Sequence, residues 1–168
     1  MDIDEPGWPL IDDFFAGLAS GRKAETCRRY ARVRLRLYDF LDVDDMDQWL
    51  ASDQVTLLAA EREFVRDGAL WTLYGVEGLL RCLPGFVAEP TLPSTATEAR
   101  MQLSVANRLL LHLRRERQVD RSMGGAYREA MQAIGRGRID LERRLDGSPP
   151  VPRTEIAARL RQPPGAQW

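Results

Sequence analysis

Apolar residues recur at helical spacing along most of this chain, and no segment alternates with the period of two that is typical of a strand. Ile11, Phe14 and Leu18 illustrate the spacing, since positions i, i+3 and i+7 lie on one side of a helix. The pattern predicts helices over residues 10–19, 24–41, 46–50, 52–66, 69–83, 96–117, 127–134 and 139–145. Because one of these is very short and the last two form a single interrupted stretch, we expect an all-α bundle of about six helices.

The predicted helix over 24–41 has the most informative pattern. At 100° per residue its large apolar residues gather on one side, which we expect to be buried: Tyr30, Val33, Leu37, Phe40 and Leu41. Its arginines gather on another side, at Arg28, Arg29, Arg32 and Arg36. Such a helix buries the apolar stripe and exposes the arginine stripe, for which a polyanion is a natural partner.

Local chemistry predicts where the later helices begin and end. Thr95-Ala-Thr-Glu98 has the pattern of a capping box, in which the threonine and glutamate side chains each accept a hydrogen bond from the backbone amide of the other residue. Three prolines and a glycine predict a loop over Pro84–Pro93. Glycines at Ser122-Met-Gly-Gly125 and Gly135-Arg-Gly137 predict a break before the last helical stretch and an interruption within it.

Four of the six residues from 42 to 47 are aspartates, a composition that suggests either calcium binding or helix capping. The segment lacks the central glycine and the distal glutamate of an EF-hand loop. We therefore favour capping, with Asp44 and Asp45 preceding the short 46–50 helix and Ser52 or Asp53 preceding the next one.

A chain of 168 residues is long enough for one domain with a substantial core. We expect the helical bundle to span residues 10–146. An acidic lead-in, 1–9, precedes it, and a proline-rich tail, 147–168, follows it and is expected to be largely flexible.

The formal net charge of -1 hides a strong segregation of charge along the chain. Residues 1–20 carry five acids and no Lys or Arg, residues 22–36 carry seven bases and one acid, and residues 39–53 carry six aspartates and no base. Such blocks predict either a charged partner or pairing between the blocks.

The sequence contains no recognisable catalytic or cofactor-binding constellation, and we expect a non-enzymatic protein without cofactor or metal. His112 is the only histidine and has no nucleophile beside it, and Cys27 and Cys82 lack the spacing of a zinc site and are expected to be reduced thiols. No apolar run approaches the roughly 20 residues of a membrane span, and the acidic start does not resemble a targeting signal. These features favour a cytoplasmic location without membrane contact.

The arginines remain as the candidate functional residues. We predict double-stranded DNA as the partner, with phosphates contacted by Arg22, Lys23, Arg28, Arg29, Arg32, Arg36, Arg114 and Arg115. The alternative is a protein-interaction module whose arginine stripe pairs with an acidic partner, or with the chain's own acidic segments at 1–13 and 42–53. The sequence does not predict an oligomeric state.

The first forty residues resemble the opening of the SAM-like, core-binding domain of tyrosine recombinases (phage integrases). The similar positions are Phe14-Phe-Ala-Gly-Leu18, then Gly21-Arg22-x-x-x-Thr26-x-x-x-Tyr30, then Leu37-x-x-Phe40-Leu41, and Val105–Leu113 resembles that domain's closing helix. The resemblance implies a small helical bundle that clasps DNA opposite a catalytic domain. The family's catalytic arginine, His-x-x-Arg and tyrosine have no counterpart here, so it implies DNA binding without strand cleavage by this chain.

Overall fold

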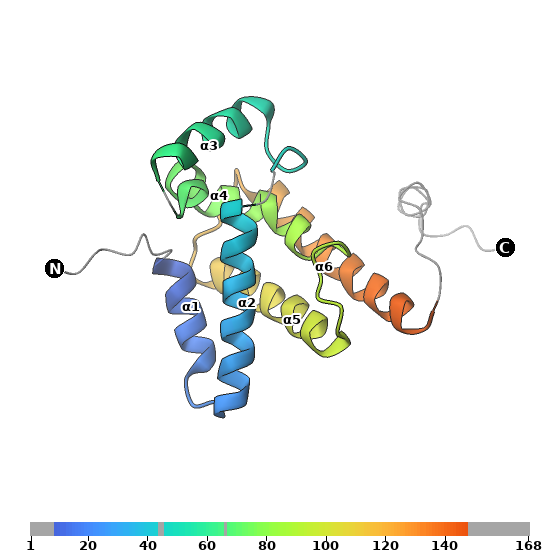
Figure 1. The fold of residues 1–168 in the computed structure, drawn as a ribbon. Helices are drawn as coiled ribbons and strands as arrows, with labels where there is room; N and C mark the ends of the chain where they lie inside the picture. The colour runs from blue at the N-terminus through green and yellow to red at the C-terminus, as the bar shows by residue number, and fades with distance from the viewer. Residues whose placement is uncertain (1–8, 44–45, 66, 148–168) are drawn as a thin grey trace.

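A computed structural model describes residues 9–43, 46–65 and 67–147, and within these residues the chain is an all-α bundle of six helices without strands, as the sequence predicts (Figure 1). The helices are α1 (Pro9–Ala19), α2 (Ala24–Val43), α3 (Ser52–Phe64), α4 (Ala69–Phe86), α5 (Ala96–Arg115) and α6 (Gly124–Leu145). The acidic residues 1–8, the capping candidates Asp44 and Asp45, and the tail at 148–168 lie outside the described residues.

The core is formed where α2, α4, α5 and α6 meet, and α1 lies alongside α2 (Figure 1). The apolar stripe predicted for α2 is buried at every position: Tyr30, Val33, Leu37, Phe40 and Leu41 are each at most 6 % exposed. The predicted phase of this helix is therefore confirmed, and it leaves the arginine stripe on the side of α2 away from the core.

The helix α4 departs from the predicted pattern at its carboxyl end and near its middle. It continues through Pro84 to Phe86, so the predicted loop begins three residues later than expected. Pro84 is buried, and its packing in the core outweighs the hydrogen bond that proline cannot donate. Further back, Gly75 adopts φ 51° and ψ -136°, which divides α4 into two helical halves.

The predicted interruption of the last helix at Gly135–Gly137 is wrong, because α6 runs without a break from Gly124 to Leu145. A Cβ atom at position 137 would lie 2.6 Å from the carbonyl oxygen of Val87 and 2.8 Å from Leu103 Cδ2. Gly137 thus permits close packing of α6 against its neighbours and does not end the helix.

Two local predictions before α3 are also wrong. Residues 46–50 form a turn and not a helix, with the amides of Trp49 and Leu50 both donating to the carbonyl of Met46. Buried Met46 and Leu50 hold this turn against the core. The cap of α3 is Ala51, not Ser52 or Asp53, and its amide donates to Gln54 Oε1 at 3.1 Å.

Candidate nucleic-acid interface

The arginine stripe of α2 extends along the helix for a little over two turns, roughly 2.2 at 3.6 residues per turn. Arg28, Arg32 and Arg36 are four residues apart, which places them about 6 Å apart along the helix axis. The side chains of Arg28 and Arg32 are 69 % and 55 % exposed, whereas that of Arg36 is 29 % exposed. The stripe therefore begins in solvent and ends in a partly covered position.

One carboxylate on α2 itself pairs with the first turn of the stripe. Glu25 Oε2 lies 3.4 Å from Arg28 Nη1, and Glu25 Oε1 lies 3.2 Å from Arg29 Nε. These contacts join residues three and four apart on one exposed helix face, where ion pairs contribute only about 0.3–0.5 kcal/mol to stability.

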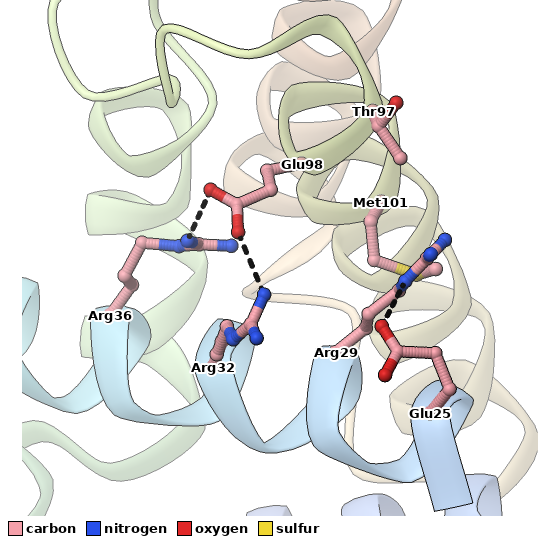
Figure 2. A pocket seen from close by; sticks show the side chains of 7 residues that line it. All are labelled: Glu25, Arg29, Arg32, Arg36, Thr97, Glu98 and Met101. Carbon is pink, nitrogen blue, oxygen red and sulfur yellow. Dashed lines mark hydrogen bonds and ion pairs between the residues drawn. The ribbon is translucent and has the colours of Figure 1, made fainter.

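A second carboxylate joins the stripe to α5. Figure 2 shows Glu98, in the first turn of α5, pointing between two arginines of α2: its Oε1 accepts from Arg32 Nη1 at 3.2 Å and its Oε2 from Arg36 Nη1 at 3.5 Å. The capping box predicted for Thr95 and Glu98 is therefore not formed. Thr95 is the N-cap of α5 but its side chain makes no capping bond, and the Glu98 carboxylate is directed to the guanidinium groups of Arg32 and Arg36.

The two helices enclose an open pocket of about 130 Å³ at this place (Figure 2). Its lining consists of Glu25, Arg29, Arg32, Arg36, Thr97, Glu98 and Met101. Three guanidinium groups and the amino-terminal turn of α5, where backbone amides carry partial positive charge, face one small space. Such an arrangement suits an anion, and Glu98 supplies that anion from within the chain.

The other edge of α2 pairs with α1. Arg34 Nη2 lies 2.9 Å from Asp12 Oδ1, the same oxygen that accepts a hydrogen bond from the Tyr38 hydroxyl. Burial, followed in importance by this bond to Asp12, raises the pKa of the Tyr38 hydroxyl. One member of the acidic 1–13 segment thus contacts α2, at an arginine outside the predicted binding set.

The remaining predicted site residues are not gathered in one place. Arg22 and Lys23 are exposed just before α2, and no ion pair of either is found among the described residues. Arg114 and Arg115 lie about 24 Å along the α5 axis from Glu98, as the rise of an α-helix requires. The Arg114 guanidinium lies 6.0 Å from the centre of the Tyr127 ring on α6, and Arg115 donates to Glu116 at 3.2 Å.

Sequence reasoning missed the role of Glu98. The residue was assigned to a local cap, and nothing in the local sequence connects it to arginines 62 and 66 positions earlier. The available signal was indirect: the stripe contains more arginines than its own helix can pair.

His112 and Cys82 are two described residues for which the sequence predicts neither a catalytic nor a zinc-binding role. His112 lies beside the Phe14 ring and 3.3 Å from Arg115 Nη2, and burial raises the pKa of the Cys82 thiol to about 12, so that thiol stays protonated at neutral pH. Within the described residues no group of His, Cys, Asp or Glu is arranged to hold a metal ion, and no helix has the length and apolar character needed to cross a bilayer.

No protein-family model, curated protein or solved structure matches this chain.

Proposed function

We propose that this protein binds double-stranded DNA through its basic face, defined as Arg22, Lys23, Arg28, Arg29, Arg32 and Arg36. The observation that carries the proposal is an imbalance of charge: two carboxylates, Glu25 and Glu98, pair with the four arginines of this face. The surplus positive charge lies on a straight helix, and phosphates are the groups that such a surface neutralises best.

The likeness of residues 14–41 to the core-binding domain of tyrosine recombinases supports the same partner, on sequence grounds alone. The proposed role is non-catalytic: the face has side chains that contact phosphates, and the proposal assigns no chemistry to any of them.

An acidic protein partner is the second candidate, and one observation favours it. Leu35 is 63 % exposed and lies two turns from Arg28 on the same side of α2. An apolar side chain beside arginines is typical of protein interfaces, in which arginine is enriched.

Binding to a labelled DNA duplex, titrated by fluorescence anisotropy at several salt concentrations, tests the first candidate. Each neutralised phosphate contributes about -0.9 to the log-log slope, so three to five contacts predict a slope of roughly -3 to -4.5. Arg32→Ala should weaken binding to all sequences equally and make the slope shallower by about one.

Arg81→Ala is the matched control, because Arg81 is an exposed arginine on α4 that pairs with Glu77 at 2.7 Å, away from the basic face. It should bind DNA like the wild type. If the wild type shows no binding at low salt, DNA is not the partner. Salt-sensitive binding of poly-L-glutamate that Arg32→Ala weakens would then favour the acidic partner.

A further inference from the structure

Glu98 of α5 lies between two arginines of the basic face. Both oxygens of its carboxylate accept hydrogen bonds from guanidinium groups of a different helix, Arg32 at 3.2 Å and Arg36 at 3.5 Å. A phosphodiester presents the same element, two charged acceptor oxygens on one atom, and arginine binds both anions in the same way.

One donor of this arginine pair is not used by the carboxylate. The Nε–H of Arg36 is buried and has no hydrogen-bond partner among the described residues. Buried donors without partners are unfavourable, so this one favours any ligand that offers a further acceptor oxygen. A tetrahedral phosphate has more acceptor positions than a carboxylate, and the amino-terminal turn of α5 adds positive potential at the same point.

The two ion pairs are also weak enough to be exchanged. The paired side chains are between 29 % and 55 % exposed, and ion pairs in such positions contribute little to stability. The ion pairs between Glu98 and the two arginines are therefore weak, yet the negative charge of Glu98 repels any anion that approaches these arginines.

We infer that Glu98 is a built-in competitor for the phosphate-binding position, and that a DNA phosphate must displace its carboxylate from Arg32 and Arg36 to bind there. The inference rests on the proposed function, since it concerns the same face. The affinity of this face for DNA is then limited by the Glu98 carboxylate, which already lies in the pocket between α2 and α5.

Neutralising the competitor should strengthen binding. Glu98→Gln removes the charge while keeping the shape of the side chain, and we expect DNA affinity at low salt to rise about tenfold, the usual size of one charge–charge interaction at a partly exposed site. Glu98→Asp keeps the charge and shortens the reach, and it should not bind more tightly than the wild type.

Glu25→Gln is the control for net charge. It removes one negative charge from the same face, but the ion pairs that Glu25 makes with described residues lie within α2, to Arg28 and Arg29. If the effect were general electrostatics, Glu25→Gln and Glu98→Gln would strengthen binding equally. The inference requires a clearly larger gain for Glu98→Gln.

A thermal melt of each variant gives a readout without DNA. Inorganic phosphate should raise the melting temperature of Glu98→Gln more than that of the wild type, because Arg32 and Arg36 then lack a competing negative charge and bind the free ion more tightly. A purely structural Glu98 would instead lower the melting temperature when substituted and leave its phosphate dependence unchanged.

The outcomes separate the two proposals. If the wild type binds DNA and Glu98→Gln binds no better, the competitor role is wrong while the proposed function stands. If only Glu98→Gln binds, the competitor role is supported and the unmodified chain is not a DNA-binding protein by itself. If neither binds, both proposals are wrong.

Discussion

The helices α5 and α3 relate to the rest of the molecule in opposite ways. Eight residues of α5 are buried, and the helix lies between α2 and α6. Only Leu58 is buried in α3, which packs chiefly against α4, while Leu57 and Phe64 are 51 % and 84 % exposed. A helical pattern therefore predicts that a helix forms, but its burial depends on how many neighbours reach it.

Polar contacts hold α3 where apolar burial does not. Arg62 Nη2 donates to the carbonyl of Leu41 at 2.8 Å, and the Tyr74 hydroxyl donates to the carbonyl of Gln54 at 2.7 Å. Each is a hydrogen bond of about 0.5–1.5 kcal/mol net, or somewhat more for the charged donor. The attachment of α3 is thus made of a few separable bonds, unlike the continuous packing around α5.

The largest expected loss of stability comes from creating a cavity where α5 packs in the core. Leu103→Ala should lower the free energy of unfolding by about 2–5 kcal/mol, because Leu103 is 1 % exposed and its removal leaves a cavity. Leu57→Ala, the same change in α3, should cost less than about 0.5 kcal/mol. Urea denaturation measures both, and equal losses would show that α3 is as integral to the core as α5.

A smaller effect is expected where α6 approaches the same interior. Gly137→Ala should destabilise the protein by about 1–3 kcal/mol through the contacts with Val87 and Leu103. Gly135→Ala is its matched control: no atom lies within 4 Å of the new methyl group, so alanine's better helix propensity should stabilise by up to about 1 kcal/mol. Opposite signs in thermal melts would confirm that space, not helix propensity, selects glycine at position 137.

The smallest effect is expected at the exposed end of α3. Phe64→Ser should change the free energy of unfolding by less than about 0.5 kcal/mol. Hydrogen exchange sharpens the same comparison, because amides of α3 should exchange through local openings that leave α5 protected. Protection of α3 amides equal to that of α5 would contradict the distinction between the two helices.

The parts of the fold that the sequence predicts are those governed by spacing alone. The buried stripe of α2 and the positions of the main helices follow from the 3.6-residue period. Predictions from single residues failed where tertiary packing competes with local preference. Pro84 and Gly137 are read locally as breaks, but each lies buried inside a helix whose packing outweighs that preference.

The candidate site likewise has features that follow from residue spacing and features that depend on tertiary packing. Exposure of Arg28 and Arg32 follows from the phase of α2, so it was predictable. The place of Glu98 was not, because a local cap and a distant guanidinium group compete for one carboxylate, and only the packing of α5 against α2 decides between them. Arg114 and Arg115 lie at the opposite end of α5 from Glu98, and the sequence does not predict how α5 is oriented against α2.

The backbone conformation of Gly75, which separates the two halves of α4, determines whether an L- or a D-residue suits that position. Gly75 has φ 51° and ψ -136°, and no atom outside the adjacent backbone lies within 4 Å of where the Cβ of an L-residue would be. Reversing the sign of both angles gives a conformation close to polyproline II, which is comfortable for an L-residue, so the observed one is comfortable for a D-residue. The backbone angles at position 75 therefore favour a D-residue, and D-alanine introduced by chemical ligation would avoid the conformational cost that an L-residue meets there. L-alanine has the same atoms but the opposite chirality, and the observed angles are unfavourable for it, so it would distort the backbone between the two halves of α4. Chirality is therefore the property that this position selects.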